Sequence, residues 1–242
     1  MTTVKDLLKV VIQRYPHLSL SHVRVVLASH VGQTTTFLFA HPEYPLSSAQ
    51  RDRVWQDIEM LAQGTPLSGI LGRREFWGHD FFLSPETLDP RPDSETLIEA
   101  ILKYHPHKNL PLSIVDMGTG TGCLLLSLLK EYPYAAGLGV DYSLGALETA
   151  QRNAHALGVG ERAQFQASDW WKSVEGAFDL IISNPPYISD EDYLSLDPVV
   201  RDYDPMRALK GGKDGLDAYR TLIKGAAAFL KPKGHLIIEI GW

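Results

Sequence analysis

From residue 94 onward, short apolar segments alternate with segments of helical spacing, and this alternation constrains the fold more than any other feature of the chain. The segments with the length and apolar content of buried strands are residues 113–117, 136–140, 163–167, 178–183 and 235–240. The expected helices are residues 94–104, 123–131, 144–157 and 218–230. Strands that alternate with helices are typical of a mostly parallel sheet covered on both faces. We therefore expect an α/β, Rossmann-like domain over residues 94–242.

The first 93 residues have a different pattern. Helical spacing of apolar residues over residues 4–15 and 19–30, and a third helix that begins at Ser47 or Ser48, predict a helical domain over residues 1–75. Residues 76–93 contain aromatics, a glycine and several prolines, which predict a short hairpin and a linker. We expect the domain boundary near residues 84–93.

Composition excludes several classes of protein. The chain has 242 residues, of which 44% are hydrophobic and 21% charged, as in an ordinary globular protein. A net charge of −6 argues against non-specific nucleic-acid binding without excluding a local basic patch. The single cysteine, Cys123, rules out an internal disulfide and a cysteine zinc cluster. We expect a cytoplasmic monomer without a metal, a membrane segment or a stable nucleic-acid partner.

A glycine-rich stretch follows the expected strand 113–117 and opens the expected helix 123–131. Glycines let the backbone pass close beneath a ligand, although a glycine-rich turn without a ligand is the alternative. The dinucleotide fingerprint GxGxxG requires glycine where this chain has Cys123, whereas alternate glycines fit the loop of S-adenosylmethionine enzymes. We therefore prefer S-adenosylmethionine as cofactor, with S-adenosylhomocysteine as product. The candidate binding residues of this loop are Gly118, Thr119, Gly120, Thr121 and Gly122.

Two further strand ends carry candidate nucleoside ligands. Asp141 ends the second strand, where a carboxylate can accept hydrogen bonds from ribose hydroxyls; the alternative is a carboxylate at the start of the next helix. Asp169 and Trp170 follow the third strand and are suited to bind and cover an adenine ring. Trp171 fits core packing as well as a ligand role.

The tetrapeptide Asn184-Pro185-Pro186-Tyr187 follows the apolar strand 178–183. Two prolines end the strand rigidly, because proline fixes φ and lacks an N–H for the sheet. The Asn184 side-chain oxygen and the Pro185 carbonyl can accept both N–H groups of an amide or amino nitrogen, while Tyr187 stacks on the planar group. This pattern predicts methyl transfer to a planar nitrogen without a strong base, provided that a void connects this corner to the glycine loop. The alternative is a proline turn that only ends the strand.

Together these residues resemble the bacterial protein-(glutamine-N5) methyltransferases (PrmC/HemK family), which modify class I peptide chain release factors on the glutamine of a Gly-Gly-Gln motif. The resemblance extends over nearly the whole chain. Besides the motifs above, the matching segments are residues 72–78, 90–95, 208–209, 211–212, 214–216 and 239–242. The Asn-Pro-Pro-Tyr motif alone is shared with DNA adenine and RNA guanine methyltransferases, so the combination carries the resemblance.

The resemblance implies a role for each matching position. The glycine loop, Asp141, Trp170 and Asn184 would contact S-adenosylmethionine, and residues 184–187 would hold the substrate glutamine. Arg91 and Glu95 would border the pocket, although a surface cation and a first-turn carboxylate explain them equally well. Ser94 stands where the family usually has threonine. The family also has a carboxyl-terminal strand pair that this chain lacks, so we expect residues 235–240 to form an edge strand open to association.

Three other functions compete with this interpretation. A nucleic-acid amino methyltransferase would flip a base into the same pocket, and the acidic net charge weighs against it. A second alternative is a module that binds a release factor without turnover. A nicotinamide dehydrogenase ranks last, because its chemistry does not require an Asn-Pro-Pro-Tyr turn.

Overall fold

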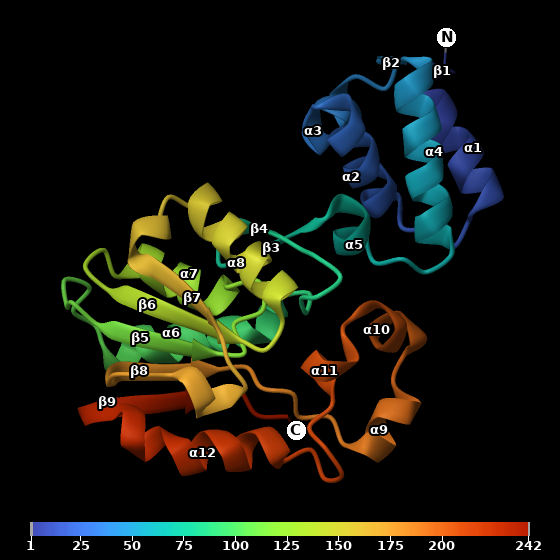
Figure 1. Cartoon of the computed structure of the whole chain (residues 1–242). Helices are drawn as coiled ribbons and strands as arrows, with labels where there is room; N and C mark the ends of the chain where they lie inside the picture. Colours follow the sequence, from blue (N-terminus) through green and yellow to red (C-terminus); the bar gives the residue numbers. More distant parts are fainter. Residues whose placement is uncertain (1, 242) are drawn as a thin grey trace. The chain divides into compact units, whose positions relative to one another are not determined.

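The computed structural model describes residues 2–241 and forms two compact units that divide between Gly72 and Arg73 (Figure 1). Met1 and Trp242, the ends of the two expected domains, lie outside the described residues. The division precedes the hairpin of β3 (Arg73–Phe76) and β4 (His79–Phe82), rather than falling near residues 84–93. The reason is packing, because Phe76 and Phe81 of this hairpin are buried in a core of the second unit.

The first unit is a group of helices around its own apolar core. Capping boxes fix the starts of two of these helices: Thr3 with Asp6 begins the helix at Val4, and Ser47 with Gln50 begins the helix at Ser48. A two-stranded antiparallel pair joins β1 (Thr2–Thr3) to β2 (Pro45–Leu46). The helices are α1 (Val4–Arg14), α2 (Leu20–Val31), α3 (Thr35–Ala40), α4 (Ser48–Ala62) and α5 (Leu67–Leu71). The spacing of apolar residues predicted α1, α2 and α4, whereas α3 and α5 are too short to show it.

The second unit contains a five-stranded parallel sheet in the order β7-β6-β5-β8-β9. Its strands are β5 (Ser113–Met117), β6 (Ala136–Asp141), β7 (Ala163–Ala167), β8 (Phe178–Ser183) and β9 (Leu230–Ile238). The chain runs outward from β5 through β6 to β7 and then returns to β8 on the other side of β5. Open α/β sheets bind ligands beyond the carboxyl ends of the strands at such a reversal. The fold therefore directs attention to the ends of β5 and β8.

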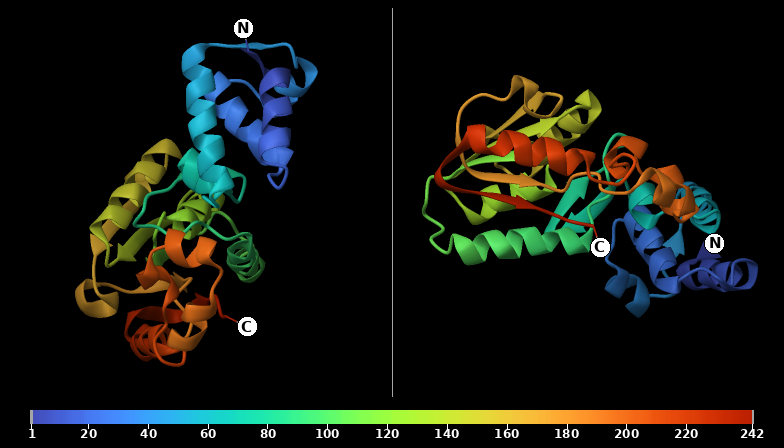
Figure 2. Two further views of the ribbon diagram at one scale, coloured as in Figure 1. Left: turned by 90° about the vertical axis from the view of Figure 1, so that its right-hand side faces the viewer. Right: turned by 90° about the horizontal axis from the view of Figure 1, so that it is seen from below.

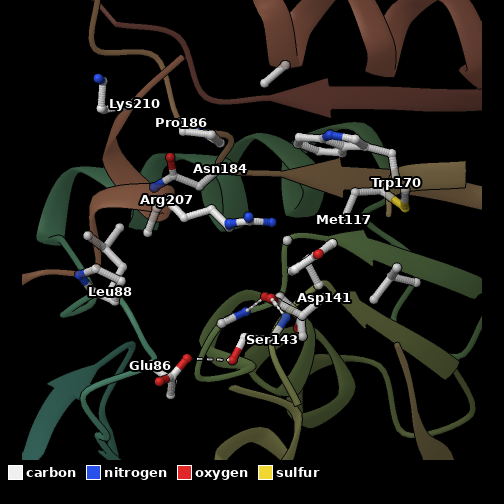
Figure 3. Close-up of a pocket in the computed structure, with 18 of the residues that line it drawn as sticks. Glu86, Leu88, Met117, Asp141, Ser143, Trp170, Asn184, Pro186, Arg207 and Lys210 are labelled. Carbon is white, nitrogen blue, oxygen red and sulfur yellow. Dashed lines mark hydrogen bonds between the residues drawn. The ribbon is translucent and has the colours of Figure 1, made fainter. Parts of the chain in front are cut away.

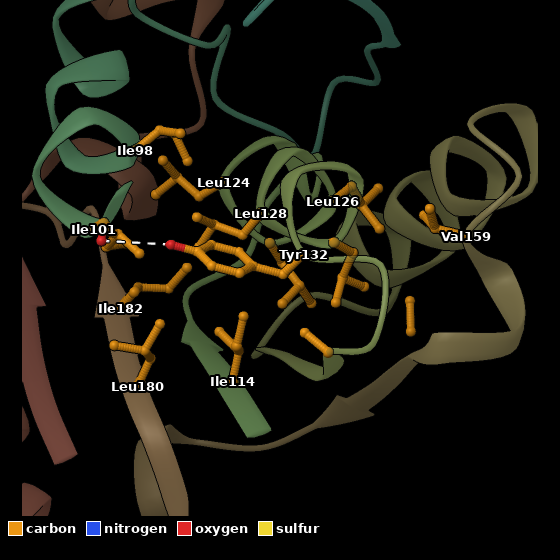
Figure 4. Packing of buried hydrophobic residues seen from close by; sticks show 14 of the residues in the cluster. Ile98, Ile101, Ile114, Leu124, Leu126, Leu128, Tyr132, Val159, Leu180 and Ile182 are labelled. Carbon is orange, nitrogen blue, oxygen red and sulfur yellow. Dashed lines mark hydrogen bonds between the residues drawn. The ribbon is translucent and has the colours of Figure 1, made fainter. Parts of the chain in front are cut away.

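Helices cover both faces of the sheet, as the alternation of strands and helices predicted. The long helices are α6 (Glu95–Tyr104), α7 (Cys123–Glu131), α8 (Leu144–Ala156) and α12 (Asp217–Phe229). Ile114 and Ile182 point to the core that contains α6 and α7, which Figure 4 shows around the buried Tyr132. Their neighbours Val115 and Ile181 point to the core beneath α12, because successive side chains of a strand face opposite ways. The right-hand view of Figure 2 looks onto α12.

Two parts of the second unit differ from expectation. The segment after β8 forms the short helices α9 (Asp190–Ser195), α10 (Pro198–Tyr203) and α11 (Met206–Leu209), which lack an apolar stripe long enough to predict. β9 begins earlier than residue 235, because Leu230 already pairs with Phe178 across a register shift.

The short 3₁₀ helices are η1 (Pro92–Ser94), η2 (Gly160–Arg162) and η3 (Trp170–Ser173). Between residues 2 and 241, none of the helices is both long and apolar enough to cross a bilayer.

Candidate active site

The glycine loop and Asn184 leave the sheet side by side. β5 ends at Met117 and β8 ends at Ser183, and the buried Ser183 hydroxyl donates a hydrogen bond of 2.5 Å to the Met117 carbonyl. A cavity of about 1040 Å³ is lined by Gly118, Gly120 and Asn184 together (Figure 3). The void that the expected chemistry requires between the loop and the proline corner is therefore present.

The glycine loop forms an open cradle. Gly118 and Gly120 have φ values of 76° and 54°, a region that glycine adopts without steric cost. A Cβ built on either residue would meet nothing within 4 Å, so both face open space in the cavity. Gly122 has a different role, because its Cβ would lie 3.0 Å from Leu126 Cδ1 and it starts α7 outside the cavity lining. An elongated ligand can thus lie directly on the backbone of the loop.

Beneath this loop, Asp116 is a buried carboxyl group that the sequence did not single out. Thr119, one of the predicted residues, donates a hydrogen bond of 2.7 Å to Asp116 Oδ2. In the described part of the chain, Asp116 Oδ1 is buried without a hydrogen-bond partner. Burial raises the pKa of Asp116 to about 7, against the opposing effect of the Thr119 hydroxyl. Thr121, also predicted, is buried and lines the cavity.

Asp141 lines the cavity and holds the glycine loop in place. Its Oδ2 accepts the Gly120 N–H at 2.9 Å, and its Oδ1 accepts the Ser143 N–H at 2.9 Å. The predicted alternative, a carboxylate at the start of α8, thus holds in part, although the helix cap itself is the Ser143 hydroxyl. Each carboxylate oxygen can accept a second hydrogen bond, so both can still take ribose hydroxyls.

The third strand end provides one aromatic wall. Trp170 and Asp169 both line the cavity, and Trp170 has the unusual φ of 53°. Asp169 is exposed and pairs with Lys172 at 2.7 Å. Trp171 instead stacks on Phe229 with ring centroids 4.8 Å apart, which settles its two possible roles in favour of packing.

At the proline corner, the four residues have different surroundings. Asn184 lines the cavity, and its Nδ2 donates a hydrogen bond of 2.8 Å to Ser94 Oγ. Pro186 also lines the cavity, whereas the buried Pro185 and the side chain of Tyr187 are both absent from its lining. Tyr187 is half-buried, and its hydroxyl lies 3.5 Å from Glu239 Oε1. Burial and, to a lesser extent, the Glu239 carboxylate raise the pKa of Tyr187, so the phenol stays neutral.

Glycines after α11 support the backbone of the corner. A Cβ on Gly211 would lie 2.7 Å from the Pro186 carbonyl oxygen, and one on Gly215 would lie 2.4 Å from that of Tyr187. Real Cβ atoms do not approach backbone so closely, so only glycine fits at either position. The segment after α11 is therefore part of the corner.

Comparison with known proteins gives the family. Residues 83–200 match the model of the methyltransferase small domain, and residues 14–72 match that of the PrmC N-terminal domain. The release factor glutamine methyltransferase of Agrobacterium fabrum is 43% identical over 90% of this chain and 77% of its own length. That of Bradyrhizobium diazoefficiens is 45% identical over 90% and 74%, respectively. The chain belongs to the release factor glutamine methyltransferases.

A solved structure supports the fold of this methyltransferase. The hMettl16 catalytic domain, solved in complex with a 3′UTR hairpin, has a TM-score of 0.53 and 14% sequence identity. The match covers 76% of this chain and 66% of that chain. At this identity, the likeness concerns the arrangement of helices and strands alone.

Arg91 and Glu95, which were predicted to border the pocket of this methyltransferase, differ in position. Arg91 lines the cavity and forms an ion pair of 2.5 Å with Asp204. Burial raises the pKa of Asp204 despite this ion pair. Glu95 is absent from the cavity lining, and its Oε1 accepts the N–H of Trp77 at 2.8 Å, where φ is 52°. The structure therefore brings Arg91 to the site, whereas Glu95 stabilises the turn of the β3–β4 hairpin.

Tyr142, Glu86 and Arg207 are among the side chains in the wall of the cavity that were not predicted. The Arg207 guanidinium lies 3.9 Å from the centroid of the Tyr142 ring. Glu86 accepts a hydrogen bond of 2.9 Å from the Ser143 hydroxyl (Figure 3). Tyr142 could have been predicted, because it follows Asp141 directly in the sequence. Glu86 and Arg207 could not, because they lie in segments without a periodic pattern.

Proposed function

We propose that this protein transfers the methyl group of S-adenosylmethionine to the side-chain amide nitrogen, N5, of the glutamine in the Gly-Gly-Gln motif of class I peptide chain release factors. The observation that carries the proposal is the single cavity that joins the glycine cradle and Asp141 to Asn184. The names of the curated relatives supply the kind of substrate.

The cavity fits the cofactor in shape and in polarity. S-adenosylmethionine supplies an electrophilic methyl group when bound. Gly118 and Gly120 leave room for it against the backbone, and Asp141 accepts the ribose hydroxyls. Trp170 covers the adenine, while Asp169 accepts a hydrogen bond from it. Thr119, Thr121 and Gly122 hold the shape of the loop from below.

The corner orients the acceptor. An amide nitrogen is a poor nucleophile because its lone pair is delocalised, so positioning has to provide most of the rate enhancement. Asn184 Oδ1 and the Pro185 carbonyl accept the two N–H groups of the glutamine, and Tyr187 stacks on its planar amide. The same acceptors stabilise the positive charge that grows on the nitrogen. Its proton leaves after transfer, so no general base is assigned.

Parallel reactions test the proposal. Labelled methyl donor is supplied with a class I release factor, with duplex DNA and with ribosomal RNA, and mass spectrometry locates the label. The proposal expects label on the glutamine of the Gly-Gly-Gln motif alone. Label on adenine or guanine would replace it with the nucleic-acid alternative, and cofactor binding without any transfer would favour the non-catalytic module.

The substitution Asn184→Ala tests the role of the corner. Removal of one preorganised group that contacts developing charge typically lowers kcat by about 100-fold or more. Cofactor affinity should change little, because Asn184 chiefly orients the acceptor. Calorimetric titration with S-adenosylhomocysteine measures that affinity. Parallel losses of cofactor affinity and kcat would contradict this assignment.

We propose further that the first unit recognises the release factor and that the protein acts as a cytoplasmic monomer. Phe39 is an apolar side chain of this unit with 74% of its surface exposed. Phe39→Ser should raise KM for the whole release factor while leaving KM for a short Gly-Gly-Gln peptide unchanged. Light scattering should give a mass near 26.9 kDa, and twice this mass would refute the monomer.

A further inference from the structure

Behind the corner, three side chains from distant parts of the sequence form a hydrogen-bonded series. Asn184 Nδ2 donates to Ser94 Oγ at 2.8 Å, and the Ser94 hydroxyl donates to Glu239 Oε2 at 2.5 Å. Ser94 is only 2% exposed, so water does not compete for its hydroxyl. The series runs from the sheet end beyond β9, through the start of α6, to the site.

The chemistry of the three groups fixes the direction of the series. A carboxylate can only accept hydrogen bonds, and a serine hydroxyl has a single proton to donate. Once Ser94 donates this proton to Glu239, it can offer only lone pairs to its other neighbour. Asn184 must therefore turn its NH₂ group toward Ser94 and its Oδ1 away from it. Within residues 2–241, Asn184 Oδ1 accepts no hydrogen bond and is not among the fully buried atoms, so it is available to a ligand in the cavity.

Glu239 itself is held on several sides. Its backbone N–H donates to the Ser183 carbonyl at 3.0 Å, and its backbone carbonyl accepts the Tyr219 hydroxyl at 3.1 Å. Its second carboxylate oxygen lies 3.5 Å from the Tyr187 hydroxyl. The carboxylate thus has a fixed position relative to both polar side chains of the corner.

We propose that Glu239, acting through Ser94, positions the Asn184 amide with its oxygen toward the substrate and thereby makes the site selective for a carboxamide over a carboxylate. The proposal rests on the function proposed above. A glutamine side chain brings N–H donors, which Asn184 Oδ1 accepts, whereas a glutamate side chain brings only acceptors and is rejected. A reversed Asn184 would present N–H donors and favour the glutamate.

The matched variants Ser94→Ala, Ser94→Thr and Ser127→Ala test this positioning. Ser94→Ala removes the acceptor that sets the orientation of Asn184, whereas Ser94→Thr keeps the hydroxyl. Ser127 is the control, because it is a fully buried serine whose hydroxyl has no partner in the described part of the chain. For each variant, kcat, KM, cofactor affinity and inhibition by a release factor with glutamate in place of the target glutamine are measured.

Ser94→Ala should lower kcat by about 2-fold, since an amide without a fixed orientation spends about half of its time in the unproductive one. Cofactor affinity should stay the same, and the glutamate protein should inhibit at least several-fold more strongly relative to the glutamine substrate. Ser94→Thr and Ser127→Ala should retain the discrimination of the original protein. An unchanged preference for glutamine in Ser94→Ala would overturn the proposal.

Glu239→Gln provides an independent variant if Ser94→Ala fails to fold. A glutamine there can donate as well as accept, so Ser94 is no longer forced to turn its proton toward it. We expect a partial loss of discrimination, and full discrimination in this variant would also refute the positioning role. Failure of the unaltered protein to label the release factor would refute the proposed function instead. The two proposals therefore fail in different experiments.

Discussion

The buried carboxyl group of Asp116 predicts a pH-dependent stability that one substitution should remove. Burial raises the pKa of Asp116 from 3.8 to about 7, with a smaller contribution from the nearby Asp141 carboxylate. The folded protein therefore keeps this proton up to about pH 7, whereas the unfolded chain releases it near pH 4. Because the folded state binds more protons in this window, the free energy of unfolding falls as pH rises through it and is level above it.

The magnitude follows from the size of this rise. At 1.36 kcal/mol for each pH unit, a pKa rise from 3.8 to about 7 corresponds to a stability loss of about 4 kcal/mol once the carboxyl ionises. Asp116→Asn is neutral at every pH and should not show this loss. Its buried NH₂ group costs about 1–3 kcal/mol where Oδ1 now has no partner, and this cost does not depend on pH.

Urea unfolding of both proteins from about pH 5 to about pH 8 measures the difference. Between about pH 5 and pH 7, the stability of Asp116→Asn relative to the original protein should increase by about 3 kcal/mol, and above pH 7 it should remain constant. Asp214→Asn is the control, because an exposed carboxyl group whose pKa is lowered to about 2 stays ionised over this range. A difference between Asp116→Asn and the original protein that does not change with pH would refute the reasoning.

Three further substitutions probe the site and its support. Asp141→Ala should weaken S-adenosylhomocysteine binding by about 10-fold or more in calorimetry, and an unchanged dissociation constant would remove Asp141 from the site. Gly211→Ala should lower the free energy of unfolding by about 1–3 kcal/mol, because its Cβ meets backbone oxygen at 2.6 Å. Gly160→Ala, with nothing closer than 3.9 Å, should be nearly neutral, and equal effects of the two would contradict the packing argument. Trp171→Phe should cost about 1 kcal/mol of stability without affecting cofactor affinity, and a weaker cofactor affinity would return Trp171 to the site.

The sheet could be predicted because its strands are short apolar runs between turn signals. The parallel direction of the strands also follows from the sequence, since a helix separates most successive strands. The helices α9, α10 and α11 could not be predicted, because each has too few turns to show an apolar stripe. Side-chain caps, Ser189 and Asp197, begin α9 and α10. The extent of the first unit depended on Phe76 and Phe81, and their burial in the other core has no signature in the sequence.

Within the site, the sequence predicted what lies at the ends of strands. The glycine loop, Asp141 and Asn184 line the cavity because each follows a strand of the same parallel sheet. Contacts between distant segments could not be predicted. Ser94 and Glu239 were noticed only as matching positions, although their hydrogen bond spans 145 residues of sequence. Glu95 illustrates the opposite case, because its position at a helix start says nothing of the Trp77 amide that it binds.

The backbone around Ile188 has a consequence for how the rim of the site can vary. The Ile188 N–H donates to the Leu209 carbonyl at 3.0 Å, and the Ile188 carbonyl accepts the Gly211 N–H at 2.8 Å. The segment of residues 189–208 therefore leaves and returns to the core of the unit at the same place. Insertions or substitutions in residues 189–208 need not shift the prolines, since these two backbone hydrogen bonds hold the two ends of the segment together. Sequence changes in residues 189–208 can therefore alter the wall of the cavity, to which Arg207 belongs, without displacing the backbone of the two prolines.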